Sequence, residues 1–208
     1  MQSFGEILRK ILEALASFFK SRSPAKTQTS KPVPKPENPL PPVVDVPPPV
    51  VPQKPKWHSP IHADKFRVTQ KFFTPDSKNY PKTGHHPGTD YGTQGADNIP
   101  LFYCADGEVI ESGNNHKYFG NYFFYYVPEV DRTFVYFHLR DTAPVKGTYA
   151  VGEECGIAGN TGLSFGAHLH LECMKGRQTS ADRSRLYSSP DALTVAAEDP
   201  DPFIRMRL

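Results

Sequence analysis

Four histidines and one aspartate are concentrated in two short stretches of the sequence. GHHPGTDYG (84–92) contains an adjacent histidine pair and an aspartate four residues after the second histidine, and GAHLHLEC (166–173) contains two histidines separated by one residue. Zinc binds imidazole nitrogens and carboxylate oxygens, and a catalytic zinc keeps one of its positions for water. Zinc lowers the pKa of that water towards 7, where an imidazole also titrates and can carry the proton. The two stretches therefore contain the residue types of a zinc site with proton-transfer groups.

The first stretch must bend if its histidine and aspartate are to meet. Pro87-Gly88 lies between His86 and Asp90 and excludes a helix there. A fully extended chain would separate the two side chains by about 13 Å, which is too far to share a metal. Proline followed by glycine is typical of a type II turn. We therefore expect such a turn to make His86 and Asp90 converge.

The second stretch has the alternation of a β-strand. Successive side chains of a strand point to opposite faces, so AHLHLE places His168, His170 and Glu172 on one face. Leu169 and Leu171 then lie on the other face, towards a hydrophobic core. We expect the two imidazoles to project side by side from this strand.

A third strand, TFVYFHLR (133–140), ends in another histidine. By the same alternation His138 shares a face with Phe134 and Tyr136, opposite Val135, Phe137 and Leu139. We expect His138 to join the pocket of the other histidines.

The turn and the two strands together predict one shared metal site. His86, Asp90 and one of the histidines at 168 and 170 make a set of two histidines and one carboxylate, and the remaining histidines stand beside the bound water. The chain has no HExxH motif and hence no glutamate base of that kind. A histidine must therefore move the proton.

The residues fall into three predicted segments. Apolar residues at intervals of three and four in FGEILRKILEALASFFK (4–20) predict an amphipathic helix within segment 1–23 that anchors or docks the chain. Dense proline in segment 24–56 predicts a semi-rigid linker. Segment 57–208 has aromatic and β-branched runs separated by glycine, asparagine and aspartate, and we expect a mainly β domain, an antiparallel sheet or sandwich with a groove.

Composition narrows the classes of protein. A net charge of +2 indicates no nucleic-acid partner. No stretch reaches the roughly 20 apolar residues of a membrane-spanning helix. Cys104, Cys155 and Cys173 have no C-x-x-C spacing, so they are either buried thiols or one disulfide with a spare thiol.

Three blocks of the sequence together resemble a known family. HPGTD, VYFHL and GNTGLSFGAHLHLE are similar, in this order, to the signature blocks of the lysostaphin-type zinc endopeptidases, which cut peptidoglycan peptides. The resemblance covers residues 64–174, and DPDPFI (199–204) is similar to the closing segment of the family. It implies a zinc endopeptidase domain that hydrolyses peptide bonds in bacterial peptidoglycan, with one zinc ion per chain.

The resemblance also implies roles for individual residues. His86, Asp90 and His170 match the zinc ligands of the family. His168 and His138 match its catalytic pair, and Tyr80 resembles a tyrosine that holds the developing oxyanion in some members. His85 lies one residue too early to be the ligand and is expected in the groove wall or behind the ligands, and Glu172 is a candidate to orient His170. The segment 175–198 looks like an insertion that either borders the groove and affects specificity or is only a surface loop, and we expect the surface loop.

Two classes of function remain open on the sequence alone. The first is the endopeptidase, and the second is a non-catalytic cell-wall-binding or hydrolase-activating module on the same fold. A copper or nickel carrier fits the strand histidines and turn glycines less well. The amphipathic segment predicts attachment to a membrane surface, a virion component or a second copy of the chain. Without a clear cleavable signal peptide, the expected location is the cell envelope, the periplasm or the extracellular space, including virion association.

Overall fold

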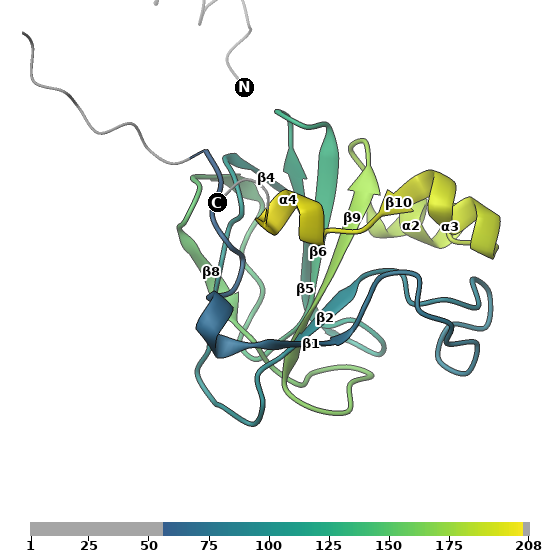
Figure 1. Ribbon diagram of the computed structural model, residues 1–208. Helices are drawn as coiled ribbons and strands as arrows, with labels where there is room; N and C mark the ends of the chain where they lie inside the picture. The colour runs from purple at the N-terminus through teal and green to yellow at the C-terminus, as the bar shows by residue number, and fades with distance from the viewer. Residues whose placement is uncertain (1–55, 206–208) are drawn as a thin grey trace, which may run out of the picture. The chain divides into compact units, whose positions relative to one another are not determined.

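An eight-stranded antiparallel sheet forms the centre of residues 56–205, the part of the chain that the computed structural model describes (Figure 1). Along the sheet the strands are β1 (Arg67–Gln70), β2 (Thr89–Gly92), β9 (His168–Lys175), β6 (Arg132–Leu139), β5 (Gly120–Val127), β4 (Gly107–His116) and β7 (Gly147–Tyr149). The short β10 (Ala197–Glu198) pairs with β9, and β3 (Pro100–Phe102) pairs with β8 (Glu154–Ile157) in a second sheet. The predicted mainly β, antiparallel fold is confirmed. The predicted helix at 4–20 lies outside the described residues, as does the linker apart from Lys56.

Hydrophobic clusters cover both faces of the large sheet, which explains why its central strands are almost continuously apolar. One cluster contains Tyr91, Leu101, Phe123, Tyr125, Phe134, Tyr136, Leu169 and Leu171. The cluster on the opposite face contains Phe124, Val135, Phe137, Met174, Tyr187 and Leu193. Neighbouring strand residues alternate between the two clusters, as the period of a strand requires. Leu169 and Leu171 are completely buried, as predicted, and thereby set the direction of the histidines between them.

The segment 175–198 is not the surface loop that the sequence led us to expect. It forms the helices α2 (Ser180–Leu186) and α3 (Pro190–Ala196), and α4 (Asp201–Arg205) follows β10. The side chain of Thr179 caps α2 in a reciprocal capping box with Asp182. Ser189 caps α3, with Pro190 in its first turn. Both capping signals are visible in the sequence, as Thr179 with Asp182 and as Ser189 with Pro190, and they predict the starts of α2 and α3.

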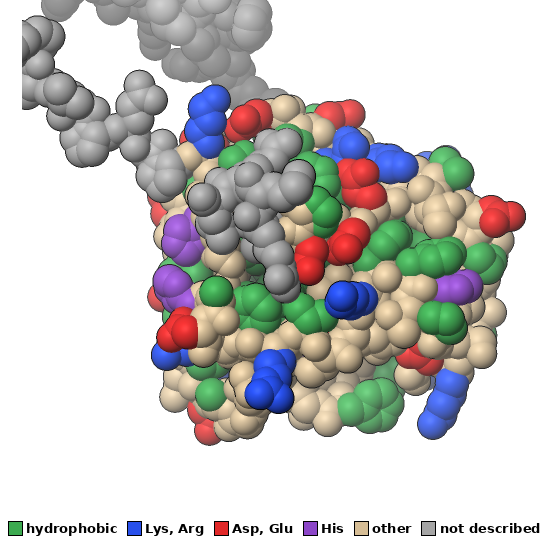
Figure 2. Space-filling model, in the orientation of Figure 1, with side chains coloured by type: hydrophobic (Ala, Val, Ile, Leu, Met, Phe, Trp, Pro, Cys, Tyr) green, Lys and Arg blue, Asp and Glu red, His purple; other side chains and the backbone are tan. Residues whose placement is uncertain are grey.

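Cys104, Cys155 and Cys173 are free thiols and all are buried. Among the described residues, no helix has the length and hydrophobicity needed to cross a membrane. Acidic and basic side chains are interspersed on the face shown in Figure 2, as expected for a net charge near zero.

Candidate active site

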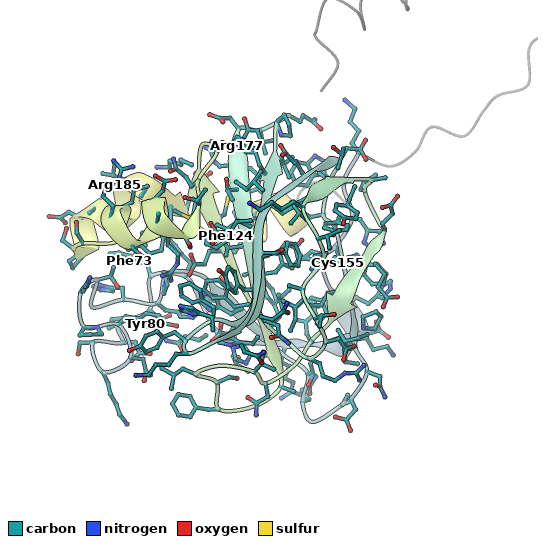
Figure 3. The ribbon with its side chains drawn as sticks, turned by 180° about the vertical axis from the view of Figure 1, so that it is seen from behind. Phe73, Tyr80, Phe124, Cys155, Arg177 and Arg185 are labelled. Atoms are coloured by element: carbon teal, nitrogen blue, oxygen red, sulfur yellow. The ribbon has the colours of Figure 1, made fainter. Side chains whose placement is uncertain are left out.

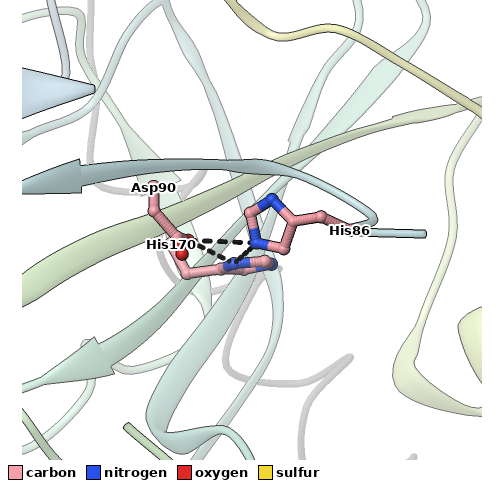
Figure 4. A group of neighbouring side chains, drawn as sticks. All are labelled: His86, Asp90 and His170. Atoms are coloured by element: carbon pink, nitrogen blue, oxygen red, sulfur yellow. Dashed lines mark hydrogen bonds and ion pairs between the residues drawn. The ribbon is translucent and has the colours of Figure 1, made fainter. Parts of the chain in front are cut away.

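The three predicted ligands converge at the junction of β2 and β9. Asp90 and His170 are direct partners in the register of these strands, and Asp90 Oδ1 lies 2.8 Å from His170 Nδ1 (Figure 4). His86 Nε2 lies 3.2 Å from Asp90 Oδ1 and 3.1 Å from His170 Nδ1. Two donor atoms of a tetrahedral zinc site with bonds near 2.05 Å stand about 3.3 Å apart. The three side chains therefore fit a zinc ion in donor type and in spacing.

His86 reaches this point from the loop between β1 and β2. Its backbone N–H donates to Thr74 O at 2.9 Å, and its carbonyl accepts from Phe73 N at 2.8 Å. Its ring Nδ1 donates to the carbonyl of Lys71 at 3.2 Å, which leaves the Nε2 lone pair facing Asp90 and His170. The ring is fully buried. The backbone thus selects both the position and the tautomer of His86.

The bend between His86 and Asp90 is not the predicted type II turn. That turn requires a positive φ at Gly88, and Gly88 is not among the glycines with positive φ in the described chain. Glycine is needed here because of crowding: a Cβ at position 88 would stand 2.4 Å from Leu171 O and 2.9 Å from Leu171 C. The loop therefore passes directly against β9, which brings His86 beside His170.

Gly88→Ala is therefore expected to destabilise the protein by about 1–3 kcal/mol, because β2 or β9 must move to admit the methyl group. Urea denaturation of the metal-free protein measures this change. Gly166→Ala is the matched control, since a Cβ at position 166 meets nothing within 4 Å. Equal stability of the two variants would contradict the close approach described here.

His170 is held from its other side by a buried carboxylate. Its Nε2 donates to Glu172 Oε1 at 3.0 Å, and Glu172 also accepts hydrogen bonds from Arg183 and from the hydroxyl of Tyr187. Burial alone would raise the pKa of Glu172, but the charge of Arg183 and the hydrogen bonds from His170 and Arg183 lower it to about 2. Burial opposes the imidazolium of His170, yet hydrogen bonds to Asp90 and Glu172 raise its pKa to about 9 in the metal-free protein. Arg183 and Tyr187 were not predicted as site residues, because both come from the segment that we expected to be a surface loop.

His138 and His168 stand next to this cluster and share one arrangement. Their ring centroids are 4.7 Å apart. Nδ1 of His138 donates to Thr161 O at 2.7 Å, and Nδ1 of His168 donates to Gly166 O at 2.7 Å. Each Nδ1 proton is thus engaged by a carbonyl, so each neutral ring has its lone pair on Nε2. The Nε2 of His168 lies 3.7 Å from Asp90 Oδ1.

Both of these histidines are neutral at pH 7. Burial and the charges of His170 and His168 lower the pKa of His138 to about 3. The pKa of His168 is also lowered, chiefly by burial, although the charge of Asp90 opposes this shift. A neutral imidazole with a free Nε2 can accept a proton, which is the requirement for a general base.

The orientation of His138 differs from the prediction. Phe134 and Tyr136 lie in the cluster on the far face of the sheet, whereas Phe137 stacks on the His170 ring, with centroids 5.3 Å apart. His138 has a φ of 65°, a left-handed conformation in which histidine is enriched among non-glycine residues. This residue interrupts the alternation of β6, so His138 turns to the face of Phe137 and enters the site.

Tyr80 and His85 occupy different positions relative to the cluster. The ring of Tyr80 lies 5.4 Å from that of His86, and burial followed by the charge of Asp90 raises its pKa, so it remains a phenol that can donate a hydrogen bond. Figure 3 shows Tyr80 and Phe73 in the region of the β1–β2 loop. His85 stacks on Phe73 at 4.1 Å and its Nδ1 donates to Thr83 O, so it lies outside the group of converging ligands.

The site opens into a cavity of about 1130 Å³. Asp90, His138, His168 and His170 line it together with Tyr80. Its rim includes the exposed apolar side chains of Tyr118, Leu163 and Phe165, and its lining also includes Lys78, Asn79, Lys82, Ser180 and Arg183. A large cavity with polar groups gathered at one point is typical of a ligand-binding site.

Comparison with known proteins assigns the family. Residues 84–182 match the sequence model of "Peptidase family M23", and the chain therefore contains a peptidase domain of this family. The match includes the three converging side chains and the histidines at 138 and 168. Its last residue is the one before Arg183.

Two curated relatives come from Vibrio cholerae. The chain is 32% identical to "Peptidoglycan DD-endopeptidase ShyA" over 126 residues, which is 59% of this chain and 27% of that protein. It is 32% identical to "Peptidoglycan DD-endopeptidase ShyB" over 145 residues, 67% of this chain and 32% of that protein. The chain thus spans about a third or less of the length of these relatives.

Solved structures show the same fold. Lysostaphin from Staphylococcus simulans has a TM-score of 0.54 with 20% identity, over 73% of this chain and 54% of that one. The catalytic domain of lysostaphin alone has a TM-score of 0.53 with 20% identity, over 68% of this chain and 94% of that one. The mainly β domain described above is therefore the fold of lysostaphin.

Proposed function

We propose that this chain is a zinc-dependent endopeptidase that hydrolyses peptide bonds in bacterial peptidoglycan, either stem-peptide cross-links or bridges. The observation that carries the proposal is the convergence of His86, Asp90 and His170 beside two neutral histidines. The ligand atoms of the first three all lie within 4.8 Å of one another. The substrate class is supported by the similarity to two peptidoglycan DD-endopeptidases.

The mechanism follows from the arrangement of the side chains. His86 Nε2, Asp90 Oδ1 and His170 Nδ1 would hold the zinc, which when bound polarises the scissile carbonyl and lowers the pKa of water. His168, with its Nδ1 proton engaged by Gly166 O, accepts a proton from the attacking water at Nε2. His138 can serve in the same way and return a proton to the leaving amine. Tyr80, protonated at neutral pH, donates a hydrogen bond to the developing oxyanion.

The test of this function is a combined measurement on the purified protein. Zinc per chain is determined after dialysis, and purified peptidoglycan is assayed for newly released amino groups. We expect close to one zinc per chain and release of amines that chelation stops and added zinc restores. Zinc binding without hydrolysis of any wall type would favour the non-catalytic binding or activating module. No zinc binding would overturn the proposal.

Zinc affinity should depend on pH because of His170. The Nδ1 that would bind zinc carries a proton in the metal-free protein up to a pKa of about 9. Zinc must displace this proton, so its apparent affinity should rise about tenfold per pH unit from pH 7 to 9 and then level off. Competition with a chelator, corrected for the chelator's own protonation, measures this slope. An affinity that is constant from pH 7 to 9 would contradict the prediction.

The location and attachment of the enzyme are also part of the proposal. If the proposed substrate is correct, the domain acts in the cell envelope, the periplasm or the extracellular space. The amphipathic residues 4–20 would attach the chain to a membrane surface, a virion component or a second copy, with residues 24–56 as the linker. Deletion of residues 1–30 should abolish binding to vesicles, virions or its own copies without loss of hydrolysis. Unchanged partitioning in all three assays would refute the attachment.

A further inference from the structure

Arg183 of α2 forms a two-pronged ion pair with Glu172, the carboxylate behind His170. Its Nη2 donates to Glu172 Oε1 at 2.6 Å, and its Nε donates to Glu172 Oε2 at 2.8 Å. The side chain of Glu172 is 0% exposed and that of Arg183 is 13% exposed. Parallel donation by a planar guanidinium fixes the plane of a carboxylate as well as its position, which a lysine cannot do.

The surroundings of Arg183 hold it in this geometry. Its guanidinium lies over the rings of Phe119, Phe137 and Tyr187, at 5.1, 5.4 and 4.7 Å from their centroids. Phe137 is also the ring that stacks on His170, with an angle of 9° between the ring planes. Arg183 thus contacts two of the groups that hold the His170 ring: the carboxylate of Glu172 at its edge and the ring of Phe137 on its face.

Charge explains why a cation is needed beside Glu172. A buried carboxylate that loses its charge partner is strongly unfavourable, and the hydrogen bond from the neutral Tyr187 hydroxyl does not replace a cation. Glu172 takes its hydrogen bond from His170 on the same oxygen, Oε1, that accepts from Arg183 Nη2. A shift of the carboxylate would therefore move or free the Nε2 of His170 and with it the metal-facing Nδ1.

We propose that Arg183 is a positioning residue for the zinc site: through Glu172 it fixes the orientation of His170, the ligand contributed by β9. This inference rests on the proposed zinc-dependent function. Groups that hold the far nitrogen of a metal-binding histidine typically change metal affinity by about 10–100-fold when they are replaced. The clamp comes from α2, at a residue beyond the match to the family. The helix α2, in a segment that we expected to be a surface loop, would therefore fix the orientation of a metal ligand through Glu172.

Zinc affinity of the full-length protein tests the proposal independently of hydrolysis. Arg183→Met removes the charge and both hydrogen bonds at similar volume, and we expect it to weaken zinc binding about 10–100-fold in chelator competition. Arg183→Lys keeps the charge but not the two-pronged ion pair, and its zinc affinity should lie between those of Arg183→Met and wild type. Arg185→Met is the control, because Arg185 belongs to the same helix with a side chain that is 73% exposed (Figure 3). It should bind zinc like wild type.

A double-mutant cycle separates positioning from general loss of structure. If Arg183 acts through Glu172, adding Arg183→Met to Glu172→Gln should change zinc affinity by less than about threefold, because the two residues act as one unit. The absorption spectrum of the cobalt-substituted protein reports ligand geometry, and should change in Arg183→Met but not in Arg185→Met. Thermal unfolding of the metal-free variants identifies any that do not fold. If Arg183→Met does not fold, the zinc affinities of Arg183→Lys and of the charge-neutral double variant are compared with wild type instead.

The outcomes are distinct. Wild-type affinity in a folded Arg183→Met, or in Arg183→Lys where Arg183→Met does not fold, would overturn the inference. Fully additive effects of Arg183→Met and Glu172→Gln would do the same. Failure of the wild-type protein itself to bind Zn²⁺ would instead overturn the proposed function.

Discussion

Asp90→Asn is expected to remove zinc from the protein and to lower the rate of peptidoglycan hydrolysis by at least about 10³-fold. Asp90 Oδ1 is the anionic member of the proposed ligand set, 2.8 Å from His170 Nδ1 and 3.2 Å from His86 Nε2. Asparagine keeps the shape of the side chain but presents a neutral oxygen. A catalytic metal supplies several kcal/mol of charge stabilisation, which corresponds to this loss of rate. Zinc per chain after dialysis and the initial rate of amine release measure the two effects.

Asp97→Asn is the matched control for this substitution. Asp97 is exposed, lies on the loop that follows β2 and does not line the cavity. We expect it to retain zinc and activity. Thermal unfolding of both variants without metal shows whether the fold is intact. Full activity of a folded Asp90→Asn protein would contradict the assignment of Asp90 as a ligand.

The strand β9 was the most predictable part of the site. Its side chains follow strict alternation because Leu169 and Leu171 are buried in the core, so the faces of His168 and His170 follow from the sequence alone. Pairing with β2 then places Asp90 directly opposite His170. The alternation of apolar residues in β9 therefore predicted which face of the strand carries His168 and His170.

Alternation fails where the backbone leaves the β region. The positive φ of His138 reverses the direction of its side chain, and no residue type in TFVYFHLR signals that change. The crowding of Gly88 against Leu171 O is equally invisible, because it joins residues 83 positions apart. Local rules therefore predicted His138 on the wrong face of its strand and Gly88 in the wrong type of turn.

Arg183 was missed for a different reason. Its partner Glu172 is eleven residues away, and an arginine in a polar segment is normally a solvated side chain. The capping box of Thr179 and Asp182 predicts the helix but not which of its faces packs on the sheet. Only the packing of α2 beside β9 makes this arginine a buried partner of the site.

His168→Ala is expected to keep zinc at the level of wild type and to lower kcat by about 10²–10⁴-fold, the usual range for loss of a general base. Both histidines of the H-x-H motif are close to Asp90, since His168 Nε2 lies 3.7 Å and His170 Nδ1 2.8 Å from Asp90 Oδ1. The ring of His170 is locked by Glu172, whereas that of His168 is held through its Nδ1 by Gly166 O, which leaves Nε2 free to accept a proton. Zinc content and single-turnover hydrolysis measure the two properties separately.

Loss of zinc from His168→Ala would show that the roles of the two histidines are reversed. His62→Ala serves as control, because His62 is exposed and its ring contacts His58 and Phe102 rather than the metal ligands. A combined His138→Ala and His168→Ala variant tests the pairing of the two neutral histidines. If both act on the same proton transfer, the double variant should be about as slow as the slower single variant, because groups that act as a unit lose their effect together. Fully multiplicative losses would instead show that the two imidazoles contribute independently to the same rate-limiting transition state.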